Sequence, residues 1–91
     1  MRARDTNIPD PEVLALQALV WAIGEPDRAD RLIAVTGLFP DDLRARAGEP
    51  AVLGAVIEYL ESYEPDLIAC AHALGVPPEA LVGARQALEL R

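Results

Sequence analysis

The chain contains no lysine, and all 8 of its basic residues are arginines among 91 residues. Without lysine there can be no Schiff-base chemistry and no phosphate-binding loop of the G-x-x-x-x-G-K-[ST] type. The chain also has only 1 histidine. An enzyme built from these residues would have to rely on carboxylates, arginine or cysteine. We therefore expect a non-enzymatic protein without a cofactor.

Cysteine is equally scarce, because Cys70 is the only one. No intrachain disulfide can form, which favours a reducing cytoplasmic setting over secretion. Cys70 and His72 stand two positions apart, so on a helix they point in different directions and cannot share a metal ion. The apolar run from Val13 to Ile23 is shorter than the roughly 20 residues that cross a bilayer, and no A-x-A cleavage signal follows it. We expect a cytoplasmic protein with no metal site and no membrane association.

Acidic residues outnumber basic ones by 15 to 8, for a net charge of −7. Residues 1–46 carry 8 acidic and 6 basic side chains, and residues 47–91 carry 7 and 2, so the second half holds most of the excess. The densest acidic group lacks the spacing of a calcium-binding EF-hand loop. We predict that it forms a solvated face that would attract a basic partner. It consists of Glu58, Glu61, Glu64 and Asp66.

Proline and glycine divide the chain into short segments with helical periodicity. Asp10 and Pro11 are suited to begin the first helix, and Gly24 to end it. No segment alternates between apolar and polar residues as a strand would. We predict an all-α protein, a compact orthogonal bundle of five to six short helices in one domain, residues 11–91, after a polar arm, residues 1–10. The expected helices are residues 11–23, about 27–36, 40–47, about 49–63, 66–74 and 78 to about 90.

The second helix, about residues 27–36, has an amphipathic pattern. Its apolar members are expected to point largely inward: Ala29, Leu32, Ile33 and Val35. Its charged members are expected to point outward: Arg28, Asp30 and Arg31.

Trp21 is the only tryptophan, and it lies on a first helix that is apolar on nearly every side. Between Val13 and Ile23 only Gln17 is polar. Tryptophan is enriched in cores and also at interface hot spots. Core burial is the favoured interpretation. If one small bundle cannot cover this helix, the alternative is a contact between two copies through Leu16, Leu19, Val20 and Trp21.

Two glycine corners have the spacing of helix-turn-helix units. Glycine takes the left-handed conformation at the end of a helix, and a small residue before it lets the next helix approach closely. The second corner has Ala71, Gly75, Val76 and Leu81 at these places. The first has Ile33, Gly37, Leu38 and Leu43, and each corner follows a Glu-Pro-Asp triplet. We interpret the corners as a quasi-repeat that folds the chain.

Charge argues against a DNA-binding role for these corners. DNA affinity depends on neutralising phosphates with lysine or arginine. In the second corner, Glu79 stands at the start of the would-be recognition helix, where a phosphate or base edge would lie, and Arg85 comes only later. In the first corner, Arg44 and Arg46 are accompanied by two aspartates. Nucleic acid is therefore not the expected partner.

Three motifs carry a resemblance to a known family: the ALQAL opening, the TGLFPDDLRARA centre and the GVPPEAL ending. In these motifs the chain resembles the small alphaproteobacterial family called domain of unknown function 3572, over nearly all of its length after the polar arm. The resemblance implies a bacterial cytoplasmic helical protein. It brings no activity, cofactor or catalytic residue.

The sequence as a whole predicts a protein-interaction or regulatory module that binds another protein or itself. The segment DDLRARAGEP is the best charged candidate for the contact, because Arg44 and Arg46 stand out in an acidic molecule, with Asp42 beside them. Pairing with the helix ends explains these charges equally well. Leu16 and Trp21 are the apolar candidates. The alternative function is that of a degenerate helix-turn-helix protein acting in transcription.

Overall fold

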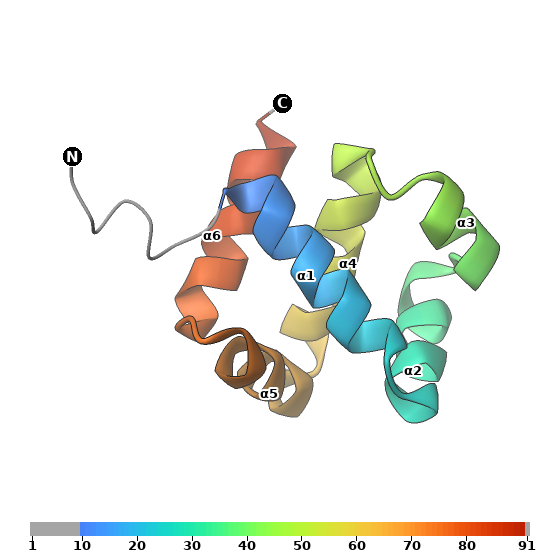
Figure 1. The fold of residues 1–91 in the computed structure, drawn as a ribbon, viewed down its shortest axis with the longest axis horizontal. Helices are drawn as coiled ribbons and strands as arrows, with labels where there is room; N and C mark the ends of the chain where they lie inside the picture. Colours follow the sequence, from blue (N-terminus) through green and yellow to red (C-terminus); the bar gives the residue numbers. More distant parts are fainter. Residues whose placement is uncertain (1–9, 91) are drawn as a thin grey trace.

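The computed structural model describes residues 10–90 and consists there of six helices without a strand (Figure 1). The all-α prediction is confirmed. Nearly all of the predicted arm, residues 1–10, lies outside the described residues. The helices are α1 (Pro11–Ile23), α2 (Pro26–Thr36), α3 (Pro40–Ala45), α4 (Pro50–Ser62), α5 (Glu64–Leu74) and α6 (Pro78–Glu89).

Five of the six helices begin at a proline, and α5 has one at its second residue. The sequence predicted a proline at the start of α1, α3, α5 and α6, whereas α2 and α4 were expected to begin near Asp27 and Glu49, one residue away from the observed Pro26 and Pro50. Proline suits this position because its missing N–H would have no partner in the first turn. At α1, the Asp10 carboxylate accepts a hydrogen bond of 3.1 Å from the backbone N–H of Glu12. At α3, Asp42 accepts one of 3.2 Å from the N–H of Phe39. The observed α3 is two residues shorter than predicted and ends at Ala45.

Both predicted glycine corners are present. Gly37 and Gly75 have φ values of 74° and 73°, in the left-handed region that favours glycine. The N–H of Val76, the residue after Gly75, donates a hydrogen bond of 3.0 Å to the carbonyl of Ala71 and so caps the C-terminal end of α5. The axes of α5 and α6 are bent by 97° at this corner, so the bundle is orthogonal there.

Among residues 10–90, no single helix is long and apolar enough to span a membrane, whereas this bent pair passes the same test by length and composition alone.

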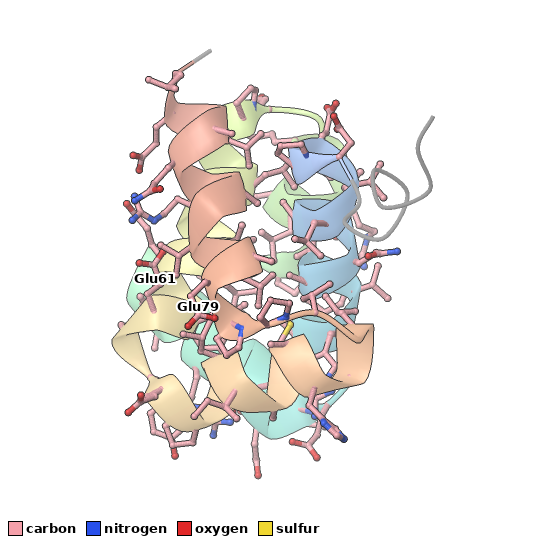
Figure 2. The ribbon with its side chains drawn as sticks, turned by 90° about the vertical axis from the view of Figure 1, so that its left-hand side faces the viewer. Glu61 and Glu79 are labelled. Atoms are coloured by element: carbon pink, nitrogen blue, oxygen red, sulfur yellow. The ribbon has the colours of Figure 1, made fainter. Side chains whose placement is uncertain are left out.

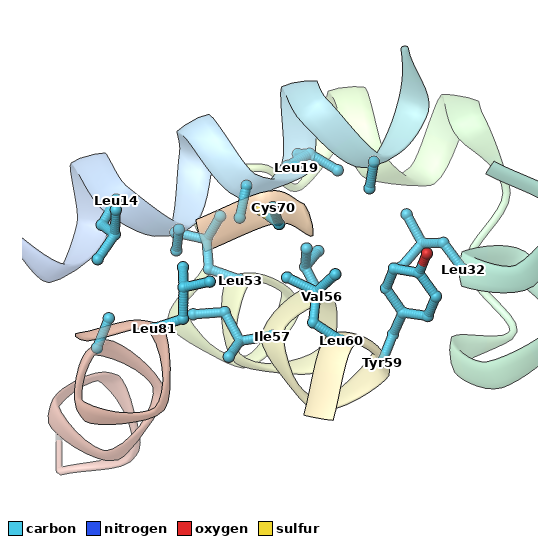
Figure 3. Packing of buried hydrophobic residues seen from close by; sticks show 14 of the residues in the cluster. Leu14, Leu19, Leu32, Leu53, Val56, Ile57, Tyr59, Leu60, Cys70 and Leu81 are labelled. Atoms are coloured by element: carbon cyan, nitrogen blue, oxygen red, sulfur yellow. The ribbon is translucent and has the colours of Figure 1, made fainter. Parts of the chain in front are cut away.

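The core lies around α4, which packs against α1, α2, α5 and α6, while α3 sits at the edge of the molecule with the fewest contacts (Figure 1). Figure 3 shows Leu53, Val56, Ile57 and Leu60 of α4 directed into the cluster. Each of these side chains is fully buried. Their spacing of three and four residues is the helical stripe that predicts such burial.

Burial along α2 differs from the prediction for Val35, Arg28 and Arg31. Val35 is 55% exposed, so its inward placement was wrong. The inward stripe of α2 consists of Ala29, Leu32, Ile33 and Thr36, at the three-to-four spacing of one helix face, and Val35 falls outside it. Arg28 and Arg31 were expected to point into solvent, yet both are partly buried because each contacts a group on another helix.

Candidate docking surface

The outer face of α1 forms one wall of an apolar groove. Val13 and Val20 are 46% and 66% exposed, although the helix buries Leu14, Ala15, Ala18, Leu19 and Ala22 on its other side. A helix that is apolar all round cannot bury every face in a bundle this small, and here the uncovered side lies next to the end of α5. The groove has a volume of about 470 Å³. It is lined by Val13, Leu16, Gln17, Val20, Trp21, Ala73 and Leu74.

Trp21 is partly buried and lies between the core and this groove. The core prediction for Trp21 is therefore only half right. The guanidinium carbon of Arg28 stands 3.9 Å from the centre of the Trp21 ring. Arg28 also donates two hydrogen bonds, of 3.1 and 2.7 Å, to the Trp21 carbonyl oxygen near the end of α1. This stacked cation fixes the indole at the end of the groove and neutralises the negative end of the helix.

The other predicted contact residues lie away from this groove, on α3 and the turn after it. Arg44 pairs with Asp41 at 2.8 Å, and Arg46 with Glu49 at 3.1 Å. Asp42 is engaged in the hydrogen bond at the start of α3. The structure thus brings Leu16 and Trp21 together in one surface and leaves Asp42, Arg44 and Arg46 in local contacts of a helix end.

A buried polar cluster ties α2, α4 and α5 together, and the sequence did not predict it. Arg31 of α2 donates to both carboxylate oxygens of Asp66 in α5, at 2.9 to 3.1 Å. Asp66 also accepts a hydrogen bond from the hydroxyl of Tyr59 in α4. Arg31 lies over the ring of Tyr63, 4.9 Å from its centre. A bidentate arginine–carboxylate pair of this kind fixes the relative positions of the helices that carry it.

This cluster changes the pKa of two of its members. Burial, together with the hydrogen bond to Asp66, raises the pKa of Tyr59 to about 12. The hydrogen bond to Asp66 raises the pKa of Arg31 above its usual value. Tyr59 is therefore a neutral donor and Arg31 a permanent cation at every physiological pH.

The acidic group predicted as a solvated face is divided by the structure. Glu58 and Glu64 are exposed as predicted. Asp66 is buried in the polar cluster, only 7% exposed, so its prediction was wrong. Glu61 is partly covered and accepts hydrogen bonds from Arg85 of α6, and it lies with Glu79 on the face shown in Figure 2. Asp66 belongs to the second Glu-Pro-Asp triplet, and its partner Arg31 lies 35 residues earlier in the chain. No local sequence pattern reveals a pairing over this separation.

Every arginine in the described part of the chain lies within ion-pair distance of a carboxylate. Arg85 pairs with Glu61 and Glu89, and Arg28 approaches Glu25 at 3.6 Å. With Arg31, Arg44 and Arg46 paired as described above, residues 10–90 present no continuous positive ridge. The exposed positions of α6 include Glu79, Gln86 and Glu89, with no cation among them.

Cys70 and His72 do not form a catalytic or metal-binding pair. Burial raises the pKa of the Cys70 thiol to about 11, which keeps it protonated and unreactive. His72 is exposed on the same helix. Within residues 10–90, no three side chains of the histidine, cysteine, aspartate or glutamate type are grouped so that they could hold a metal ion.

The described residues form a small orthogonal helical bundle in which α1 and the end of α5 line an open apolar groove. By sequence, the chain belongs to the family described as protein of unknown function DUF3572, whose model matches residues 9–90. No curated protein and no solved structure matched the chain.

Proposed function

We propose that the protein is a non-enzymatic protein-interaction module of the bacterial cytoplasm, and that it binds through the groove between α1 and α5. The observation that carries the proposal is the uncovered apolar side of α1, with Val20 two-thirds exposed beside a half-covered tryptophan. Apolar patches with an aromatic anchor are typical of protein–protein interfaces. The paired arginines and the isolated Cys70 and His72 support a role without catalysis.

The groove is a better docking surface than the arginine segment on α3. Arg44 and Arg46 already have carboxylate partners, and exposed pairs of this kind contribute little free energy. A partner would have to compete with Asp41 and Glu49 for them. The groove residues Val13 and Val20 have no such competitor, and covering them removes apolar surface from water.

The helix-turn-helix alternative is favoured by one observation, the 97° bend at Gly75. That bend falls in the range of DNA-binding corners. Against it, α6 presents Glu79 in its first turn and commits Arg85 to two carboxylates. A role in transcription would therefore need a basic partner that supplies the affinity for DNA.

Affinity capture from the native host with two matched variants tests the proposal. Val20→Glu places a charge in the groove, and Val35→Glu places the same charge on α2 at a similarly exposed position. The proposal expects the wild type and Val35→Glu to retain the same proteins, a second copy of the chain included, and Val20→Glu to lose them. Retention of every captured protein by Val20→Glu would exclude the groove as the docking surface.

A further inference from the structure

We propose that the occupant of the groove is a second copy of this chain, packed with its α1 antiparallel to the first, an inference that rests on the proposed function. A contact with two-fold symmetry requires a surface that complements itself. The exposed stripe of α1 has that property, because Val13 and Val20 lie on either side of Gln17.

When α1 of the second copy runs in the opposite direction, centred on Gln17, the apolar residues of the two helices face one another. Val13, Gln17 and Val20 follow one another at spacings of four and three, so they lie on one helix face. In an antiparallel pair, Val13 of each copy comes opposite Val20 and Trp21 of the other. Apolar side chains then cover one another on both sides of the two-fold axis.

Gln17 stands at the centre of this contact, and its chemistry suits a second copy. Its side-chain amide carries both a donor and an acceptor, so two such groups facing each other on the axis satisfy one another. A purely apolar partner would leave the amide unpaired, at a cost in free energy. None of the groove residues is charged, so neither copy brings a repelling charge to the centre.

Charges at the two ends of α1 select the antiparallel orientation. Asp10 lies at the start of the helix, and Arg28 is stacked on Trp21 near its end. Antiparallel packing brings Asp10 of one copy toward Arg28 of the other at both ends, where its carboxylate competes with Glu25, which lies 3.6 Å from the guanidinium. Parallel packing would bring like charges together and align the helix dipoles unfavourably.

The contact is small, so the association is weak and reversible. The 13 residues of α1 span about 20 Å, and a stable interface buries roughly 800 Å² on each partner. Each copy also carries a net charge of −7, which opposes association. Added salt screens this repulsion and strengthens the pair. A basic partner would show the opposite dependence on salt.

Sedimentation equilibrium of the full chain tests the proposal. We expect the average mass to rise from 9.8 kDa toward twice that value as the concentration approaches millimolar, and to rise further at higher salt. Val20→Glu should remain monomeric, while Val35→Glu should behave as the wild type. A monomeric wild type throughout this range would overturn the proposal, as would association that salt weakens.

Cysteine cross-linking tests the orientation. The native Cys70 is buried and does not compete for the oxidant. Under mild oxidation, Gln17→Cys should form a disulfide-linked dimer, and a mixture of Val13→Cys and Val20→Cys should cross-link severalfold more than either variant alone. Efficient cross-linking of Val13→Cys to itself would contradict the antiparallel arrangement.

The two proposals fail in distinguishable ways. A monomeric wild type combined with a Val20→Glu variant that loses another captured protein would reject the second copy and leave the groove as a docking surface. A Val20→Glu variant that keeps both self-association and captured proteins would reject both.

Discussion

The hydroxyl of Tyr59 donates a hydrogen bond to the Asp66 carboxylate across the break between α4 and α5. Asp66 is thereby held between a neutral donor and the guanidinium of Arg31, which reaches it from α2. Figure 3 shows Tyr59 beside Leu32 within the buried cluster. The polar cluster therefore extends the apolar core and fixes α5, one wall of the groove.

We predict that Asp66→Asn destabilises the fold. The amide carries no charge and replaces one acceptor oxygen by an NH2 donor, so it cannot keep the bidentate pair with Arg31 while it accepts from Tyr59. Loss of a buried hydrogen-bonded charge should lower the free energy of unfolding by about 2 kcal/mol or more. Urea unfolding followed by circular dichroism measures this effect. Glu64→Gln, an exposed neighbour, is the control and should change stability by less than about 0.5 kcal/mol. Equal effects of the two substitutions would contradict a structural role for the cluster.

Tyr59 should make stability depend on alkaline pH. Its pKa is raised from 10.0 to about 12, so the folded state favours the neutral phenol. This contribution is fully present below pH 10 and is lost as the pH rises through 12. The stability difference between wild type and Tyr59→Phe, about 1 kcal/mol at neutral pH, should therefore shrink above pH 10. Cys70 titrates in both proteins and cancels from the comparison. A difference that stays constant to pH 12 would refute the pKa shift.

Replacing Gly75 and Gly83 with alanine should change the stability of the fold in opposite directions. Gly75 has a φ of 73°, which alanine adopts at a cost of about 1 kcal/mol even though the space around it is open. Gly83 lies exposed inside α6 with ordinary helical geometry, where alanine stabilises by roughly 0.5–1 kcal/mol. Thermal unfolding of Gly75→Ala and Gly83→Ala compares them directly. Stabilisation by Gly75→Ala would show that the corner needs no left-handed residue.

We predict that the protein shows no salt-dependent binding to duplex DNA. The five arginines of the described residues are each paired with a carboxylate, so few countercharges remain for phosphates. Gel-shift titrations at low and high salt measure this, with Arg44→Glu/Arg46→Glu as the comparison. Salt-sensitive binding by the wild type that the double variant abolishes would instead support the helix-turn-helix alternative.

Local signals made the helices and corners predictable. Proline at the start of a helix and glycine at its end act through the backbone of a few neighbouring residues, so Pro11, Gly37 and Gly75 could be interpreted from the sequence alone. The polar cluster could not be predicted in this way, because Arg31 and Asp66 are 35 residues apart and only tertiary packing brings them together. The same limit applies to Trp21, whose half-burial depends on how α5 meets α1. The alternative considered for α1, a contact between copies through Leu16, Val20 and Trp21, fits the exposed groove, whereas Leu19 is buried in the core.

Fluorescence quenching of Trp21 by acrylamide tests the central claim most directly, because Trp21 is the only tryptophan and it lines the groove. The full chain is measured at micromolar and near-millimolar concentration, beside Val20→Glu. We predict that the quenching constant of the wild type falls by about half at high concentration, as a second copy covers the indole, and that the variant shows no change. A wild-type quenching constant that does not change with concentration would contradict the occupation of the groove by a second copy.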